Sequence, residues 1–319
     1  MKFLKAKSNA FAAATVIFGI LAAVFVFSQW GETVRVHAAR EWHVDDAGVN
    51  PAPGVCTGAT GLGDAFLTIQ KGVDCAQSGD TVVVHDGTYG GWQTRNGQPC
   101  NPTNVAGGSA SGCVNDGIIG GRVAHLVGIT GKTNITIKAA PNESPMLDGL
   151  KNLLEPLDAA FYLTSNTSGI TIEGFRITNF SATSSIELVG NQKQLGTIIW
   201  AGSPNGRILH NTFFNNDPNG FGVRPGSTFA SADINVIQAT GMEIRGNSIT
   251  TENLPYGIML RDSGVTANGI ANNYFERKKD WGNGSSVFTK STNGVRILNN
   301  YFTNTDSVKS SGSWAFILR

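Results

Sequence analysis

The chain has 319 residues, enough for one large domain or two of ordinary size. Hydrophobic residues make up 40% of it, so a core can form, and charged residues make up only 15%, which argues against long solvated helices and coiled coils. The formal net charge of +1 provides no basic field for nucleic acid. The 40 glycines follow no Gly-X-Y period, which excludes collagen. This composition favours many short strands joined by tight turns.

The first 38 residues have the outline of a secretory signal. Three lysines within the first seven residues precede an uncharged apolar run at 10–27, and Val36-His37-Ala38 offers small residues for cleavage. Because the run is long for a signal peptide, an uncleaved membrane anchor is the alternative. Either way we expect export, to a secreted, periplasmic or cell-surface location. Contact with a membrane is expected only through this segment, if it stays uncleaved.

Four cysteines, Cys56, Cys75, Cys100 and Cys113, lie in the first third of the chain. An even number of cysteines in an exported protein predicts two disulfides. Of the three possible pairings we favour Cys56–Cys75 and Cys100–Cys113, because each closes a short local loop. Metal binding is the weaker interpretation, since the spacings are not those of a zinc site.

A repeated pattern begins near Asn134 and continues almost to the end of the chain. Its units recur roughly every thirty residues, a spacing typical of stacked structural repeats. The aliphatic position of each unit falls at Ile137, Ile172, Leu209, Ile244, Ile270 and Ile297. The closing apolar position falls at Ile177, Phe214, Ile249, Phe275 and Phe302.

Each unit alternates apolar and polar residues with the period of a β-strand, as in Ile170-Thr-Ile172. A second short strand precedes each motif, at 160–163, 197–200, 234–237, 257–260 and 286–289. Short strands with Gly and Asn at the corners predict an all-β fold, a right-handed parallel β-helix. Asn247, Asn273 and Asn300 share one register, so we expect them to form a structural ladder.

The predicted β-helix domain spans 39–319, with an N-terminal cap and disulfide region at 39–130 and regular coils at 131–319. Residues 64–76 have apolar positions at helical spacing behind Asp64, an expected N-cap, and 81–85 form an apolar strand. Such a helix would cover the open edge of the first coil. At the other end, 313–319 resembles the opening strand of another coil. We therefore expect a fragment, or a domain cut before its C-terminal cap. We also expect the protein to be a monomer.

Strand alternation also predicts a row of cations on one outer wall. If Ile258, Leu260, Val287 and Thr289 point inward, Met259, Arg261, Phe288 and Lys290 point outward. Arg319 then takes the place of Lys290 on the following strand, and Gln238 lies one coil before Arg261.

A row of cations suits an anionic polysaccharide that contains uronic acid. Elimination of its glycosidic oxygen requires a base for the proton beside the carboxylate and a cation to neutralise that carboxylate. Lys290, flanked by other cations, is a candidate base, and Arg319 or Arg261 would bind the carboxylate bidentately. The alternative is that these side chains merely solubilise the strand faces.

The segment from Phe288 to Phe302, followed by Phe316-Ile-Leu-Arg319, resembles the catalytic coils of the chondroitinase B/alginate lyase family. In that family a Lys-Ser on one strand is followed by an Asn-x-Phe turn and by an Arg on the next coil. The resemblance implies that Lys290 is the Brønsted base and Arg319 the second catalytic residue. It also implies a calcium ion, whose ligands the sequence does not identify.

The competing function is that of a non-catalytic β-helix, either a surface adhesin or a carbohydrate-binding protein. It requires only the repeat. Exposed aromatic rings would serve as sugar platforms in either case, or fill core and turn positions; the candidates are Trp200, Trp281, Phe288 and Trp314. Glycoside hydrolysis is disfavoured, because the carboxylates of the repeats are scattered without a close pair. His85, His125 and His210 show no partner pattern, so we expect structural roles.

Overall fold

The structure is a computed structural model in which the chain divides into two units, Met1–Ala38 and the main unit, Ala39–Arg319. The residues it describes are 38–49, 51–52, 54–90, 94–95, 98–99, 125–151, 157, 159–180, 194–217, 230–252, 254–261, 264–278, 284–292, 294–305 and 314–318.

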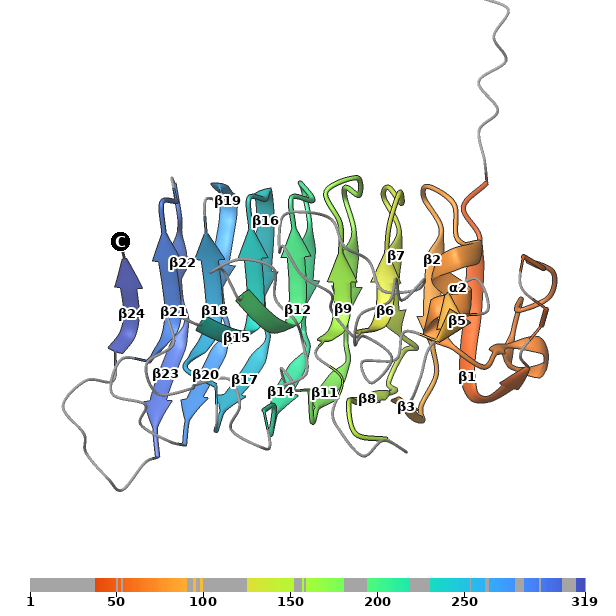
Figure 1. Cartoon of the computed structure of the whole chain (residues 1–319), viewed down its shortest axis with the longest axis horizontal. Coiled ribbons are helices and arrows are strands. Elements are labelled where there is room, and N and C mark those ends of the chain that lie inside the picture. Colours follow the sequence, from red (N-terminus) through yellow and green to blue (C-terminus); the bar gives the residue numbers. More distant parts are fainter. Residues whose placement is uncertain are drawn as a thin grey trace, which may run out of the picture. The chain divides into compact units, whose positions relative to one another are not determined.

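The main unit is a right-handed parallel β-helix, as the repeat predicts (Figure 1). Its described strands form three parallel sheets, and each sheet receives one strand from each successive coil. The first sheet contains β1 (Glu41–Val49), β2 (Thr81–Val84), β7 (Thr136–Ala139), β10 (Thr171–Glu173), β13 (Arg207–Leu209), β16 (Thr240–Arg245), β19 (Gly264–Ala271) and β22 (Ile297–Leu298).

The other two sheets complete each coil. The second sheet contains β3 (Thr88–Gly90), β8 (Met146–Asp148), β11 (Arg176–Thr178), β14 (Thr212–Phe214), β17 (Ser248–Thr251), β20 (Tyr274–Arg277) and β23 (Tyr301–Asn304). The third sheet contains β6 (His125–Ile129), β9 (Ala159–Leu163), β12 (Gln194–Ala201), β15 (Ala230–Ile237), β18 (Tyr256–Arg261), β21 (Ser285–Lys290) and β24 (Trp314–Leu318). A small antiparallel pair, β4 (Thr94–Arg95) and β5 (Gln98–Pro99), lies outside these sheets.

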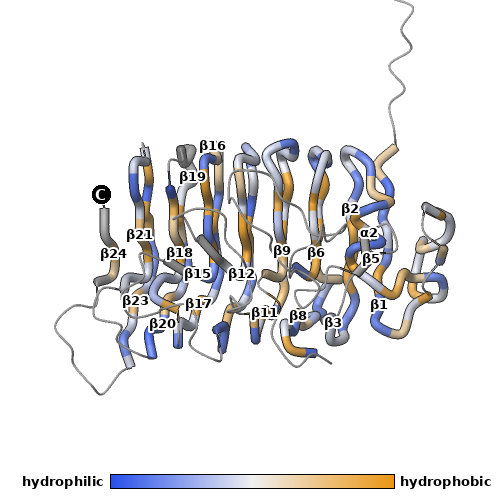
Figure 2. Tube along the Cα trace, viewed as in Figure 1, coloured by the Kyte–Doolittle hydropathy of each residue, from blue (hydrophilic) through white to orange (hydrophobic). Residues whose placement is uncertain are grey.

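Inward side chains stack in columns through the coils, and Figure 2 shows the apolar residues concentrated along the strands. The strand register predicted from the sequence is wrong by one residue in a single coil. Ile208, not Leu209, pairs with Ile172 and Ile244, and Phe213, not Phe214, pairs with Ile177. The reason is that Asn205, not Gly206, takes the left-handed corner conformation there, with φ 58°.

The predicted asparagine ladder is confirmed, and it extends one coil further to Asn211. The side-chain oxygens of Asn247, Asn273 and Asn300 each accept the backbone N–H of the asparagine one coil earlier, at 2.9 Å. Each described side-chain amide donates in turn to a backbone carbonyl, for example Asn273 Nδ2 to Ile244 O at 2.9 Å. These buried bonds satisfy the corner backbone, so the ladder is structural.

A short helix covers the first coil, as expected, but it begins later than the sequence suggests. Helix α2 spans Ile69–Cys75, and its N-cap is Thr68, whose side chain accepts the N–H of Lys71. Asp64 instead ends the 3-10 turn η1 (Leu62–Asp64), where its carboxylate accepts the N–H groups of Thr60 and Gly61. Asp64 is therefore bound to its own turn and not to the helix.

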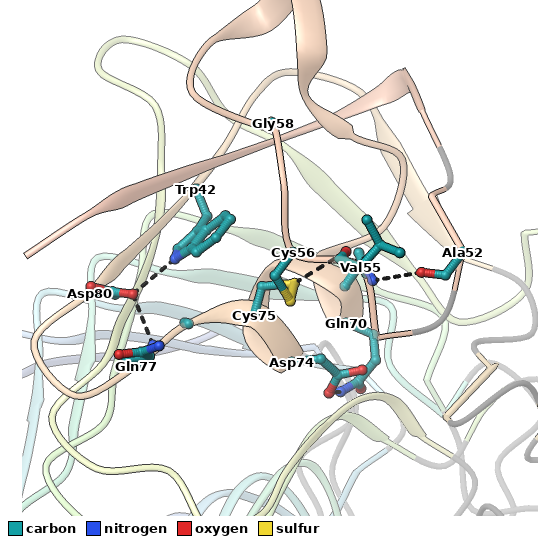
Figure 3. Close-up of a disulfide and its surroundings, with 12 residues drawn as sticks. Trp42, Ala52, Val55, Cys56, Gly58, Gln70, Asp74, Cys75, Gln77 and Asp80 are labelled. Carbon is teal, nitrogen blue, oxygen red and sulfur yellow. Dashed lines mark hydrogen bonds between the residues drawn. A yellow bond between two sulfur atoms is a disulfide. The ribbon is translucent and has the colours of Figure 1, made fainter.

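The predicted disulfide Cys56–Cys75 is confirmed, with Cα atoms 5.4 Å apart (Figure 3). It ties the segment after β1 to the end of α2. Beside it, Asp80 accepts hydrogen bonds from the Trp42 indole and the Gln77 backbone, both at 2.9 Å. These contacts join the cap to the first coil. Cys100 and Cys113 lie outside the described residues.

No helix in the described part of the chain combines the length and the apolar character needed to cross a bilayer.

Candidate functional site

The outer wall of the third sheet carries the residues proposed from the sequence. Ile258, Leu260 and Val287 belong to the main core, as the alternation predicts. Met259 and Phe288 lie in a separate apolar cluster on the opposite side of their strands. The predicted inward and outward faces are therefore correct for these residues.

The outward face is nevertheless not open along its middle. Met259 is 0% exposed and Phe288 only 9% exposed, and the Phe288 ring packs against Tyr256 at a centroid distance of 4.9 Å. The expectation that Phe288 is an exposed sugar platform is wrong. Its ring fills an apolar layer outside the sheet, where contact with neighbouring side chains replaces contact with a ligand.

Trp200 is also buried, at 0% exposure, and its indole N–H donates to Ser203 O at 2.6 Å. It belongs to the main core, so of the two roles expected for Trp200, sugar platform or core filler, the structure supports the core filler. Trp281 lies outside the described residues, and of Trp314 the structure describes only its place at the start of β24.

Arg261 and Lys290 are brought together as predicted. They end β18 and β21, and the parallel register places them directly opposite each other. Neighbouring strands lie about 4.8 Å apart, so both cations occupy one short stretch of the wall. Lys290 is exposed and Arg261 is half-buried. The structure thus presents two adjacent positive charges at the ends of consecutive strands.

The next step of the predicted row falls at the limit of the described residues. β24 pairs with β21 as far as Thr289 and Leu318, so the parallel register leads toward Arg319. Arg319 itself is outside the described residues, and its place beside Lys290 stays a prediction.

Gln238 does not take the position in this row that the sequence assigns to it. Ile237 pairs with Arg261, and Ile237 is buried together with Ala201 from the preceding coil. Gln238 is the following residue, exposed at a left-handed corner with φ 51°, and its N–H donates to Arg261 O at 2.9 Å. The corner turns one residue later than expected, so the row changes from apolar to cationic at Arg261.

Among the described residues, Lys290 takes part in no ion pair, whereas Lys138, Arg207, Arg245 and Lys278 all bind glutamates. A positive charge without a partner carboxylate remains available to an anionic ligand. Together with the adjacent guanidinium, this arrangement can hold a carboxylate and place an amine next to it.

A buried carboxyl group near this wall was not found from the sequence. Asp233 in β15 is 0% exposed, and its Oδ1 accepts the Asn216 side-chain amide at 2.8 Å, while Oδ2 has no hydrogen-bond partner. Burial raises the pKa of Asp233 to about 8, against the opposing effect of the Asn216 hydrogen bond. The signal in the sequence that could have indicated this buried carboxyl group is a single Asp inside an apolar strand. Because it is completely buried, Asp233 cannot contact a ligand on the outer wall.

The calcium ion implied by the family resemblance finds no support in the described residues. They contain no group of three or more His, Cys, Asp or Glu side chains arranged to hold a metal ion. The acidic residue nearest before Lys290, Asp280, lies outside the described ranges. We therefore derive no chemical step through calcium.

Comparison with known proteins gives one family match. Residues 226–316 match the family described as "Periplasmic copper-binding protein (NosD)", less than a third of the chain. No curated protein matches the sequence.

Solved structures with a similar course of the chain include three carbohydrate-related proteins. The pectate lyase Pel9A has 13% identity and a TM-score of 0.44 over 81% of this chain and 64% of its own. A rhamnogalacturonan lyase has 13% identity and a TM-score of 0.41 over 87% and 62%. XylC, in complex with xylose, has 12% identity and a TM-score of 0.38 over 87% and 68%. The chain thus spans less than two thirds of the length of both lyases, and we draw no functional argument from these TM-scores.

Proposed function

We propose that the protein is a polysaccharide lyase that cleaves a uronic-acid-containing anionic polysaccharide, of alginate, chondroitin/dermatan or pectate type, by β-elimination. The observation that carries the proposal is the direct pairing of Arg261 with Lys290 at the ends of β18 and β21. The same wall offers both a cation for a carboxylate and an amine for a proton.

In this reaction the Arg261 guanidinium binds the carboxylate of the uronate and stabilises the charge that develops there. The Lys290 amine takes the proton from the carbon next to that carboxylate. The electron pair of the broken C–H bond forms a carbon–carbon double bond, and the bond to the glycosidic oxygen breaks. The leaving oxygen receives a proton from water. The product carries an unsaturated sugar that absorbs ultraviolet light.

The proposed location is outside the cytoplasm. The secretory outline of 1–38 and the Cys56–Cys75 disulfide support export, because disulfides persist in oxidising compartments. The word "periplasmic" in the name of the matched family is in keeping with this. We do not extend copper binding to the chain. Residues 226–316 contain no histidine or cysteine, and both methionines in this stretch, Met242 and Met259, are fully buried.

The test is an absorbance assay of the chain with alginate, chondroitin/dermatan sulfate and pectate. Wild type should release unsaturated product from at least one polymer, and Lys290→Ala should abolish this release. Lys138→Ala is the matched control, because Lys138 lies on the first sheet. Activity that survives in Lys290→Ala would remove the proposed base. Binding without product from any polymer would instead favour the competing function, a non-catalytic carbohydrate-binding β-helix.

A further inference from the structure

Three side chains form a hydrogen-bonded chain across the first turns of the β-helix, far from the cation pair in sequence. His43 Nδ1 lies 2.9 Å from His85 Nε2, and His85 Nδ1 lies 3.1 Å from Glu143 Oε1. His43 is on β1, His85 follows β2, and Glu143 lies in the turn after β7. The chain therefore links three successive layers of the first sheet.

The geometry fixes where the protons lie. The two imidazole rings are inclined by only 16° with centroids 5.2 Å apart, so the bond between them lies close to both ring planes. Glu143 is itself held, because its other oxygen accepts the N–H of Asp86 at 2.5 Å. The Glu143 carboxylate accepts a hydrogen bond from the Nδ1–H of His85. In the neutral pair, His85 Nε2 is then the acceptor and His43 Nδ1 the donor.

This chain accommodates one added proton but not two. With one, a single hydrogen still lies between the two rings, and the Glu143 carboxylate compensates the charge. With two, His43 Nδ1 and His85 Nε2 both carry hydrogens and face each other at 2.9 Å. The hydrogen bond is then replaced by a clash between donors and by repulsion of two cations.

The charged groups around the cluster do not remove this conflict. The charged groups on β1 itself are Glu41, Asp45 and Asp46. The charged groups on the segments packed against β1 are Asp64, Asp86, Lys138 and Glu143. The Tyr89 hydroxyl also lies here and donates a hydrogen bond to His85 O. Glu41 is drawn toward Lys138, whose amine lies 3.9 Å away. Asp46 accepts the N–H of Thr88, and Asp64 the N–H groups of its own turn.

β1 is the end strand of the first sheet, and its one ladder within that sheet is to β2. On its other edge β1 forms isolated bridges from Val44 and Val49 to Phe66, and the N–H of His43 donates to Ala59 O at 2.9 Å, so this neighbouring segment would move together with β1. We infer that His43, His85 and Glu143 form a pH switch, in which protonation of both imidazoles loosens β1 from β2. Separation would uncover Trp42 and Val44, which are buried in the core beneath the strand.

The direction of the effect agrees with the environment of His43. Burial, and next the neighbouring His85, lower the pKa of His43 from 6.5, against the smaller opposing effect of Glu41 and Asp64. The unfolded or separated strand therefore binds protons more readily than the packed one. Stability of the packed strand is lost as pH falls below 6.5 toward the lowered value.

The experiment is amide hydrogen exchange on the full chain at about pH 7.5 and about pH 5, which bracket the titration of histidine, with correction for the intrinsic exchange rate. Peptides covering β1 should lose protection about tenfold or more at the lower pH, while peptides covering β17 keep theirs. His43→Asn keeps a donor near the position of Nδ1 but does not titrate. Its β1 peptides should show no such loss.

Glu143→Gln is the second variant, and it tests the inference independently if His43→Asn does not fold. Without the carboxylate the first proton is less well compensated, so loosening of β1 should begin at a higher pH than in wild type. Equal acid loss in wild type and His43→Asn would overturn the inference, as would unchanged protection of β1 in wild type. An onset in Glu143→Gln at or below the wild-type pH would also overturn it.

Discussion

Arg261 and Lys290 stand side by side on the outer wall of the third sheet, each ending its own strand. One is half-buried and the other exposed. The coil between them returns the chain to the same height on the wall, one strand spacing further along the axis. Two cations from separate repeats thereby form one local positive site.

Replacement of Arg261 should separate its role from that of Lys290. If the guanidinium binds the carboxylate in the transition state, Arg261→Ala should lower kcat/KM by about 10²–10³. Arg261→Lys should recover only part of this, because an ammonium cannot form the bidentate pair. Steady-state kinetics on the polymer that proves to be cleaved would measure both variants. Arg176→Ala, an exposed arginine on the second sheet, is the control and should retain full activity.

Loss of one rung of the asparagine ladder should destabilise the fold. In Asn273→Ala the buried N–H of Asn247 loses its acceptor, and the cost is about 1–3 kcal/mol. Thermal or denaturant unfolding would measure it. The neighbouring variant Asn272→Gly should stay within about 0.5 kcal/mol, because Asn272 is exposed and already has a left-handed φ of 55°. Similar losses in the two variants would contradict a specific role of the ladder.

The Cys56–Cys75 disulfide should stabilise the N-terminal cap. It closes a loop with a sequence separation of 19, and loops of about this length give about 3 kcal/mol through the reduced entropy of the unfolded chain. Cys56→Ser/Cys75→Ser should therefore unfold at lower denaturant concentration than wild type. Reduction of the wild type should lower the midpoint at least as much, because it also breaks any other disulfide, and no shift in the double variant would contradict the prediction.

The buried Asp233 should make stability depend on pH in a defined direction. Its pKa is about 8 in the folded chain against 3.8 in the unfolded one, so the folded state holds the proton more tightly. The contribution is complete below 3.8 and is lost as pH rises through about 8. Denaturant unfolding of wild type across this range should show falling stability. Asp233→Asn should lose that slope, and an unchanged slope would assign it to another group.

The fold was predictable because every coil repeats the same physical requirement. Inward aliphatic positions at strand period and asparagines at one corner are sufficient to define the columns. The error of one residue at Leu209 and Phe214 has a local cause. Asn205 and Gly206 are adjacent and both tolerate a left-handed corner, and only packing selects Asn205.

The candidate site was predictable only in part. The pairing of Arg261 with Lys290 follows from the strand register, since residues at equal places in successive coils become neighbours. The burial of Phe288 and Trp200 does not follow, because an aromatic residue in a strand has the same pattern whether its face is open or covered. The hydrogen-bonded chain from His43 to Glu143 joins residues of different segments without any periodic signal.

The sequence by itself determined the β-helix, its asparagine ladder, the Cys56–Cys75 bond and the meeting of Arg261 with Lys290. Each depends on local pattern or on the repeat, and the repeat converts distance along the chain into a fixed step in space. The tertiary structure alone decided which outward faces are covered, where Gln238 falls, and that two histidines and a glutamate form a hydrogen-bonded chain. These depend on contacts between segments that no period relates, so they exist only once the chain has packed.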